Sequence, residues 1–273
     1  MEHHELKDRA KRVCVGQVAV ACPGRPLDKE HRMSKTLEEI LGLARATGWD
    51  DMPTDHADLI GTTFAKNSID RAAVPFLYGL TRAISPRRAI EVGLGSGASA
   101  TTFALAARPT LAAYDIMDPY QSSGFGDRGL NALRKALADS ACALDFHEEM
   151  SHVVLPRLLA AGKRYDYAMI DASHKFDATL IEVFYIDLML VTGGIMVLDD
   201  RAWPMVGAVI EFMKTNYAHL TVDTSDARLT VVQKIGPDRR KWFDYWHFDP
   251  PRSAQMEAKI EEYRRASAAK PGS

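Results

Sequence analysis

Three carboxylates and one imidazole stand in the second half of the sequence at positions where they could do chemistry. Asp171 is followed three residues later by His174, and the pair Asp199-Asp200 ends an apolar run further along the chain. Carboxylates that meet in a fold repel one another and raise each other's pKa unless a cation neutralises them. All-oxygen ligands favour Mg²⁺, Mn²⁺ or Ca²⁺ over zinc. Such a cation could bind two adjacent oxygens of an acceptor and lower the pKa of its hydroxyl.

His174 has the side chain best suited to accept a proton beside these carboxylates. An imidazole with its ordinary pKa of about 6.5 suits a general base for a phenol or an activated hydroxyl. Plainer interpretations stay open at this point. His174 could cap the following helix, Asp199-Asp200 could be exposed turn residues, and Asp171 could touch only a cofactor.

A glycine-rich loop supplies a second candidate site. Glu91, Gly93, Gly95, Gly97 and Ser99 lie between a short apolar run and a helical pattern. Glycine lets the chain turn tightly and lets a ligand approach the backbone, while the following helix offers free N–H groups. The spacing also satisfies the dinucleotide fingerprint GxGxxA. The acidic residue before the glycines favours S-adenosylmethionine (SAM) instead, because a carboxylate there can help to hold the ligand's ammonium and sulfonium groups.

Alternating helical and apolar patterns must position both sites, and they predict an α/β fold with a parallel sheet. Ligands bind such sheets beyond the carboxyl ends of the strands. Asp115, Ser151, Asp171 and Asp199-Asp200 follow strands or connections at these ends, so we expect them to converge with the glycine loop. The expected helices cover residues 34–46, 71–83, 98–107, 128–140, 153–161, 206–217 and 253–267, and a long one has Phe176, Leu180, Phe184, Leu188 and Val191 on one stripe. The expected strands cover residues 89–92, 111–114, 143–147, 165–170, 195–198, 220–223 and 229–234.

Composition limits the class of protein. The 273 residues carry 34 Lys and Arg against 36 Asp and Glu, so the formal net charge of −2 gives no reason to expect nucleic acid or a membrane as partner. Three cysteines without a CxxC pair argue against a disulfide scaffold or a structural zinc site. The apolar run at residues 13–22 could pass for a signal peptide, but Gln17 interrupts it and the run is short. A cytoplasmic protein is expected.

The motifs between residues 68 and 235 resemble those of class I SAM-dependent methyltransferases. Within this class the sequence is most similar to the metal-dependent O-methyltransferases of the caffeoyl-CoA and catechol type. The segment EVGLGSGAS looks like their first motif, with Glu91, Gly93, Gly97 and Ser99 in matching places. The segment AYDIM looks like their second, which implies that Asp115 holds the ribose hydroxyls of SAM.

Three further segments carry this resemblance. HEEMSHVVLP resembles the segment beside the adenine, which implies Met150 and Ser151 as neighbours of the ring. YDYAMIDASHK and GGIMVLDDRAW resemble the segments that bind a divalent cation, which implies Asp171, Asp199 and Asp200 as ligands of Mg²⁺, or of Mn²⁺ or Ca²⁺. The lysine that acts as general base in the caffeoyl-CoA type falls on His174 in this sequence. In the bacterial methyltransferases of natural-product tailoring, a histidine can serve as this base.

The resemblance implies a Rossmann-like, mostly parallel seven-stranded sheet with an antiparallel last strand and helices on both faces. It also implies an O-methyltransferase acting on a small-molecule hydroxyl, with a catechol-like or natural-product acceptor. Three alternatives remain: a metal-independent N- or C-methyltransferase, an NAD-dependent oxidoreductase, and a non-catalytic nucleotide-binding module. A chelator separates the first of these from the main hypothesis.

The chain divides into three parts on this interpretation. Residues 1–60 form a cap that selects the acceptor, residues 61–236 form the SAM-binding domain, and residues 237–273 form an aromatic arm, a helix and a loose tail. The aromatic cluster at residues 242–248 is expected to pin the arm to the domain, or else to line a pocket or a homodimer interface. Trp203, just after the Asp pair, is the aromatic residue most expected to touch substrate.

Overall fold

The computed structural model describes residues 35–65, 68–226, 228–250 and 254–268. The apolar run at residues 13–22 and most of the expected N-terminal cap lie outside these residues. In the described part of the chain, no helix has the length and apolar character needed to cross a membrane.

A seven-stranded sheet in the order β3-β2-β1-β4-β5-β7-β6 forms the centre of the protein. Neighbouring strands from β3 to β5 pair in parallel, and β7 runs antiparallel to both β5 and β6. The predicted sheet, with its antiparallel last strand, is therefore confirmed. The strands are β1 (Arg88–Val92), β2 (Ala113–Met117), β3 (Ala143–His147), β4 (Tyr165–Ile170), β5 (Leu190–Leu198), β6 (Leu220–Asp223) and β7 (Thr230–Lys234).

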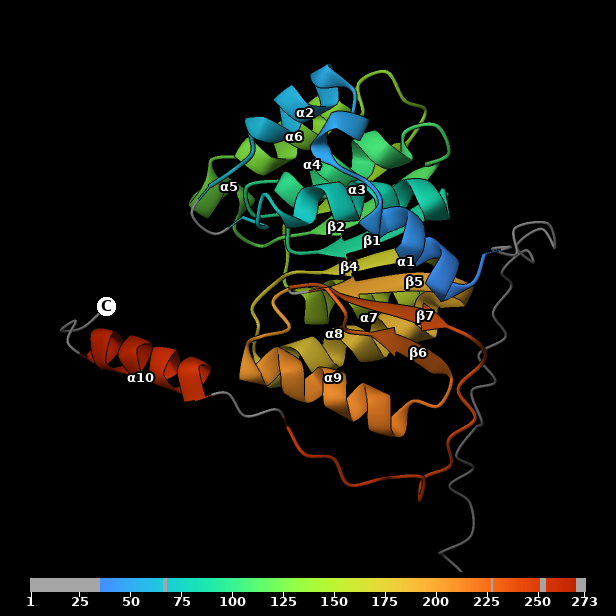
Figure 1. The fold of residues 1–273 in the computed structure, drawn as a ribbon, viewed down its shortest axis with the longest axis vertical. Coiled ribbons are helices and arrows are strands. Elements are labelled where there is room, and N and C mark those ends of the chain that lie inside the picture. The colour runs from blue at the N-terminus through green and yellow to red at the C-terminus, as the bar shows by residue number, and fades with distance from the viewer. Residues whose placement is uncertain (1–34, 66–67, 227, 251–253, 269–273) are drawn as a thin grey trace, which may run out of the picture.

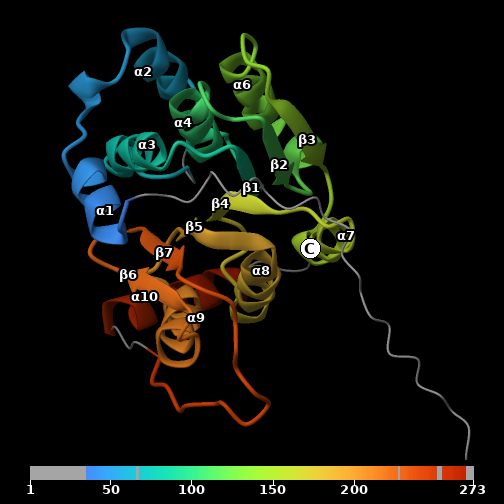
Figure 2. The same ribbon diagram turned by 90° about the vertical axis from the view of Figure 1, so that its right-hand side faces the viewer.

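Helices cover both faces of this sheet, as Figures 1 and 2 show. The core between the sheet and α1, α3, α4 and α6 is one apolar cluster, and the core beneath α7, α8 and α9 is another. The helices are α1 (Leu37–Arg45), the 3₁₀ turn η1 (Trp49–Asp51), α2 (Thr54–Gly61), α3 (Ala73–Ile84), α4 (Ala98–Ala107), α5 (Gln121–Phe125), α6 (Arg128–Ala136), α7 (Ser151–Ala160), α8 (Phe176–Met189), α9 (Pro204–Asn216) and α10 (Ala254–Ala268).

Local signals account for several of these boundaries. Thr36 and Glu39 form a reciprocal capping box at the start of α1, which satisfies two backbone donors that a helix start leaves free. α3 ends where Ser85 adopts a left-handed conformation (φ 52°) directly before Pro86. This is the stop that the Ser-Pro pair predicts, because the residue before a proline disfavours the helical region.

Strand β2 begins and ends two to three residues later than the sequence predicts. It was expected to cover residues 111–114 and to end at Asp115, but it extends to Met117, which pairs with Val92 at the end of β1. Ile116 and Met117 are apolar and buried, so they continue the strand into the core. Asp115 is consequently a mid-strand residue, and the first residue beyond the strand is Asp118.

Helix α8 lies in the expected place but turns the opposite face to the core. The stripe that includes Phe176, Phe184 and Leu188 is exposed, while Glu182 and Asp187 are buried. Val191, the expected end of the stripe, belongs to β5. The helix is apolar on almost every side, so apolar spacing alone does not choose which face meets the sheet.

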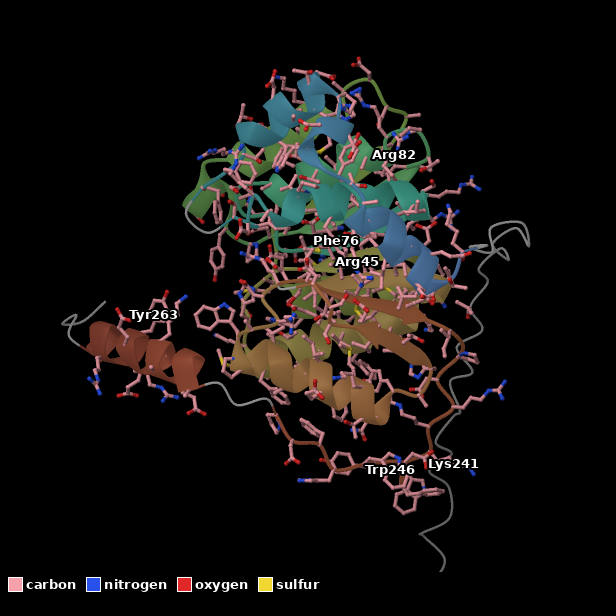
Figure 3. All side chains as sticks on the ribbon, viewed as in Figure 1. Arg45, Phe76, Arg82, Lys241, Trp246 and Tyr263 are labelled. Atoms are coloured by element: carbon pink, nitrogen blue, oxygen red, sulfur yellow. The ribbon has the colours of Figure 1, made fainter. Side chains whose placement is uncertain are left out.

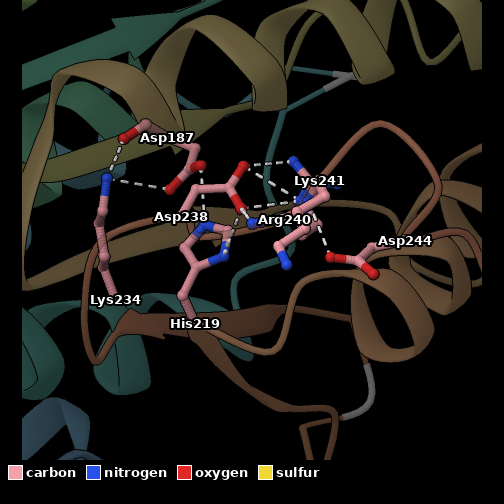
Figure 4. A network of polar contacts seen from close by, with 7 residues as sticks. All are labelled: Asp187, His219, Lys234, Asp238, Arg240, Lys241 and Asp244. Atoms are coloured by element: carbon pink, nitrogen blue, oxygen red, sulfur yellow. Dashed lines mark hydrogen bonds and ion pairs between the residues drawn. The ribbon is translucent and has the colours of Figure 1, made fainter.

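Residues 237–250 form an arm that runs beneath α9 and leads to α10 (Figure 1). The network in Figure 4 attaches its start: His219 Nε2 lies 2.9 Å from Asp187 Oδ2, and its Nδ1 lies 3.6 Å from Asp238 Oδ1. Lys234 pairs with Asp187 at 3.1 Å. Asp238 in turn binds the guanidinium of Arg240 at 2.7 Å, and that guanidinium lies over the ring of Tyr217 at 3.7 Å. His219 and Tyr217 thus attach the start of the arm to the domain.

The aromatic cluster of the arm contributes less to this attachment than the sequence suggested. Trp242, Phe243, Tyr245 and Trp246 are exposed. Phe248 makes an edge contact with Phe212, and the backbone of Trp246 exchanges two hydrogen bonds with the side chain of Asn216. Figure 3 shows Trp246 and Lys241 on this outer segment, away from the sheet.

Candidate active site

The glycine loop between β1 and α4 needs glycine for two reasons. Gly93, Gly95 and Gly97 have φ values of 91°, 51° and 87°, which side chains rarely tolerate. A Cβ on Gly93 would also meet the carbonyl oxygen of Asp171 at 1.9 Å, and one on Gly97 would lie 2.8 Å from Gly129. The loop therefore packs tightly against the start of the segment that carries the candidate catalytic residues.

Glu91 lies beneath this loop and not at its surface. Its side chain is fully buried, and it accepts hydrogen bonds from the hydroxyls of Ser99 (2.6 Å) and Tyr114. Burial raises the pKa of Glu91 to about 7, against the opposing effect of these hydrogen bonds. Both carboxylate oxygens are thus engaged within the protein, and Glu91 and Ser99 support the loop from below.

Asp118 is a residue of this site that the sequence analysis missed. Its Oδ2 accepts hydrogen bonds from the backbone N–H groups of Leu94 (3.1 Å) and Gly95 (2.8 Å). Gln121 joins the same cluster, donating to Asp118 and to the carbonyl of Gly95. The available signal was position: Asp118 is the first polar residue after the buried run that ends at Met117.

Asp115, which was expected at the strand end near the glycine loop, occupies a different place. Its carboxylate binds Lys163 Nζ at 3.1 and 3.2 Å and accepts a hydrogen bond from the Tyr165 hydroxyl at 3.0 Å. Tyr165 is the first residue of β4, so these partners come from the opposite end of the strands. The expected strand-end position of Asp115 is therefore wrong, because β2 continues for two residues beyond it.

Ser151 and Met150 stand at the start of α7, where the sequence placed the neighbours of the adenine ring. The Ser151 hydroxyl donates to Glu182 Oε1 at 2.7 Å, and Met150 is exposed. Burial raises the pKa of Glu182 to about 7, and the nearby His174 acts in the opposite direction. The buried face of α8 thus reaches the start of α7.

Asp171, His174 and Asp200 form one cluster. His174 Nε2 lies 3.4 Å from Asp171 Oδ1 and 3.3 Å from Asp200 Oδ2. Asp171 follows β4 and donates its N–H to Val92 at the end of β1, which ties the cluster to the glycine loop. His174 and Asp200 both have a φ of 54°, in the left-handed region. Strained residues of this kind are typical of sites where tertiary contacts fix a functional geometry.

The charged groups of this cluster change one another's pKa values. Burial, followed by the charge of Asp199, raises the pKa of Asp171 to about 6. Burial and Asp199 also raise the pKa of Asp200. Burial disfavours the charged imidazole of His174, but Asp171 and Asp200 outweigh this effect and raise its pKa. The cluster therefore favours positive charge at its centre.

Asp199 departs from the expected set of metal ligands. Its carboxylate is buried and binds Arg228 through two hydrogen bonds of 2.5 and 2.6 Å. One ligand atom each from Asp171, His174 and Asp200 lie within 4.8 Å of one another, and Asp199 is outside this group. The carboxylates of Asp171 and Asp200 are oxygen ligands that fit a divalent cation beside His174. The structure thus brings together two of the three predicted carboxylate ligands and the predicted base.

Trp203 connects this cluster to the C-terminal helix. It precedes α9, and its ring lies 6.0 Å from that of Tyr263 on α10, which Figure 3 labels. Lys259 Nζ lies 5.2 Å from the centre of the Trp203 ring, and its charge favours the ionised form of Asp200. The expectation that Trp203 touches substrate stays a prediction.

Solved structures of methyltransferases share this fold at low sequence identity. The O-methyltransferase TomG from Streptomyces achromogenes, which is involved in tomaymycin synthesis and was solved with SAM, is 17% identical, covers 68% of this chain and 91% of its own, and has a TM-score of 0.54. The O-methyltransferase from Bacillus cereus, solved with S-adenosylhomocysteine (SAH), is 12% identical over 67% and 92%, with a TM-score of 0.51. The SAH-bound methyltransferase PaMTH1 from Podospora anserina is 17% identical over 68% and 89%, with a TM-score of 0.54. A search of curated protein sequences gave no significant match.

The strand order, the antiparallel β7 and the glycine loop between β1 and α4 define the class I methyltransferase fold. Residues 90–201, which contain the glycine loop, Asp171, His174 and the Asp199-Asp200 pair, match the sequence family described as "Methyltransferase domain". The chain therefore has the class I methyltransferase fold that its motifs predicted, with a match to a methyltransferase domain over residues 90–201.

Proposed function

We propose that the protein transfers the methyl group of SAM to a hydroxyl of a small molecule. The observation that carries this proposal is the position of the Asp171–His174–Asp200 cluster directly beside the glycine loop. A proton acceptor and paired carboxylates at the cofactor suit a hydroxyl acceptor, which must lose a proton to become a good nucleophile. TomG acts in tomaymycin synthesis, which supports a natural-product or catechol-like acceptor for this chain.

The cofactor is proposed to lie over the glycine loop. Asp118 replaces Asp115 as the proposed carboxylate for the ribose hydroxyls, because it binds the backbone N–H groups of Leu94 and Gly95 at the loop. Met150 and Ser151 beside the adenine and Asp171 at the methionine end keep the roles that the sequence predicted. Glu91 and Ser99, which the sequence assigned to direct cofactor binding, are proposed instead to support the loop from beneath, because Glu91 is buried and bonds Ser99.

A divalent cation, Mg²⁺ first and otherwise Mn²⁺ or Ca²⁺, would be held by Asp171 and Asp200 next to His174. When bound, it would lower the pKa of the acceptor hydroxyl. His174 accepts the hydroxyl proton, the acceptor oxygen forms a bond to the methyl carbon, and the carbon–sulfur bond of SAM breaks to leave SAH. Trp203 and α10 flank the acceptor and limit access of water.

The other parts of the chain are assigned roles on the same basis. The N-terminal cap is proposed to help select the acceptor, and two hydrogen bonds from Arg128 to the carbonyls of Thr62 and Phe64 hold the segment just after the cap near α6. A homodimer through the exposed face of α8 and a cytoplasmic location complete the proposal. Neither nucleic acid nor a membrane is a proposed partner.

Calorimetric titration with SAH tests the cofactor, with NAD⁺ titrated in parallel. We expect micromolar binding of SAH and none of NAD⁺, and the reverse result would return the loop to the NAD-dependent oxidoreductases. Methylation of a panel of catechols and other hydroxyl acceptors, with and without a chelator, then tests the reaction. Full activity in excess chelator, or methyl transfer only to nitrogen or carbon acceptors, would contradict the cation-assisted O-methyl transfer proposed here.

A further inference from the structure

Arg228 lies on the connection between β6 and β7, where the antiparallel hairpin returns the chain to the Asp199-Asp200 pair. Its Nε and one terminal nitrogen bind the two oxygens of Asp199 at 2.5 and 2.6 Å. The same terminal nitrogen lies 3.3 Å from Asp200 Oδ1. The Asp199 side chain is completely buried, whereas Arg228 is 27% exposed.

This geometry uses most of the bonding capacity of Asp199. The two-pronged guanidinium takes both carboxylate oxygens, and Oδ1 also accepts the backbone N–H of Asp200 at 2.8 Å. A paired guanidinium and carboxylate in this geometry form one of the strongest polar contacts in proteins, and arginine stays charged at any working pH. Asp199 is accordingly absent from the group of ligand atoms that Asp171, His174 and Asp200 bring within 4.8 Å.

Charge balance points the same way. Three ionised carboxylates with no counter-charge would attract a divalent cation strongly but would leave the site negative after it bound. With His174 in its neutral form, the charge of Arg228 offsets one carboxylate, so two negative charges remain for the cation to neutralise. The site is then matched to a divalent ion held by two carboxylates.

We propose that Arg228 is a positioning residue that removes Asp199 from the set of cation ligands. Asp199 thereby orients Asp200 and Arg228 and does not touch the cation. The inference rests on the proposed function, since it concerns the cation of that same site. The sequence alone did not indicate Arg228 as a residue of this site.

Titration of the full-length protein with Mn²⁺ in saturating SAH, followed by calorimetry and by the Mn²⁺ paramagnetic resonance signal, tests this role. Arg228→Met frees the Asp199 carboxylate and removes a positive charge, so we expect it to bind Mn²⁺ at least tenfold more tightly than wild type. Arg201→Met is the matched control, because Arg201 donates to the backbone carbonyl of Asp226 and not to a carboxylate. Its Mn²⁺ affinity should equal that of wild type.

Arg228→Lys provides a second variant in case the methionine variant does not fold. Lysine keeps the positive charge but cannot make the two parallel hydrogen bonds to Asp199. The Mn²⁺ affinity of Arg228→Lys should therefore lie between those of wild type and Arg228→Met. Unchanged or weaker Mn²⁺ binding by the folded variants, or no Mn²⁺ binding by any of the proteins, would overturn the role of Arg228. Binding of SAH by wild type is measured in the same experiment, so its loss would identify a failure of the proposed function instead.

Discussion

The acidic residues around the glycine loop divide into two groups by their surroundings. Glu91, Asp118 and Asp199 are buried and have dedicated donors, so they shape the site. Asp171 and Asp200 keep side chains that are 20% and 24% exposed, within reach of an incoming ligand. Residue type alone does not separate these groups, because the distinction depends on donors that come from distant parts of the chain.

Substitution of Asp118 should weaken cofactor binding. Asp118→Ala removes the acceptor of two N–H groups of the glycine loop and the proposed partner of the ribose, so SAH affinity should fall at least tenfold by calorimetry. Asp115→Asn is the comparison, since Asp115 binds Lys163 and Tyr165 elsewhere in the sheet and its loss should leave SAH affinity within twofold of wild type. The opposite order of effects would restore Asp115 to the ribose site.

Glu91 should make stability depend on pH. The pKa of Glu91 is raised to about 7 in the fold, against about 4.3 in an unfolded chain, so the folded state binds more protons between these values. Stability contributed by this group is complete below about pH 4.3 and is lost as the pH rises toward 7. Glu91→Gln stays neutral, so its melting temperature should fall less than that of wild type between pH 5 and pH 8. Parallel curves for the two proteins would contradict the raised pKa.

His174 should matter for turnover and not for cofactor affinity. His174→Gln removes the proposed base, so turnover should fall by about a hundredfold or more and its pH profile should change. Binding of SAH should stay within twofold of wild type, because His174 contacts the carboxylate cluster and not the glycine loop. Wild-type turnover with an unaltered pH profile would remove His174 from the mechanism.

Among the helices, strands and loops, the sequence predicted those features that interactions between neighbouring residues determine. The glycine loop, the strand β4 and the stop at Ser85-Pro86 follow from backbone sterics and short apolar runs. The buried face of α8 and the arrival of Arg228 beside Asp199 depend on packing across the sheet. Apolar spacing in α8 is uninformative because the exposed Phe184 and the buried Val183 are both apolar. The partners of Glu182 and Asp187 decide which face is buried.

Asp187, one of the two buried acidic residues of α8, should contribute strongly to stability. Asp187→Asn leaves the Lys234 ammonium buried without its counter-charge, so we expect a loss of about 3 kcal/mol in the free energy of unfolding. Asp177→Asn, an exposed position near the start of the same helix, should change it by about 0.5 kcal/mol at most. Urea denaturation of the two variants measures this difference. Equal losses would mean that the network of Figure 4 does not hold α8 and the arm.

At the scale of the whole molecule, the outward face of α8 remains without a described partner inside the chain. Ile181, Phe184 and Leu188 are 41%, 46% and 41% exposed on consecutive turns. Apolar patches of this kind on a soluble protein often mark an interface. A second copy can cover such a face by presenting the same residues around a two-fold axis.

Size-exclusion chromatography with light scattering tests this arrangement. Wild type should have the mass of a dimer, and Phe184→Glu should have that of a monomer because a carboxylate would be buried on both sides of the axis. Phe243→Glu, which changes an exposed aromatic residue of the arm, is the control and should stay dimeric. A dimer that survives the α8 substitution and is lost with the arm substitution would move the interface to residues 242–246.

The contact between Gly97 and Gly129 sets a limit on how this sequence can vary. A Cβ on Gly129 would meet the carbonyl oxygen of Gly95 at 2.5 Å, and a Cβ on Gly97 would meet Gly129 at 2.8 Å. The backbone of the glycine loop and that of Gly129 in α6 therefore each fill the space that a side chain on the other would need. Both obstacles are backbone atoms, which no change of a neighbouring residue removes. In a library of all single and paired substitutions, every replacement at either position should be lost, and no replacement at one should rescue a replacement at the other. The glycine loop can therefore evolve through the residues beneath it, but not where its backbone meets that of Gly129.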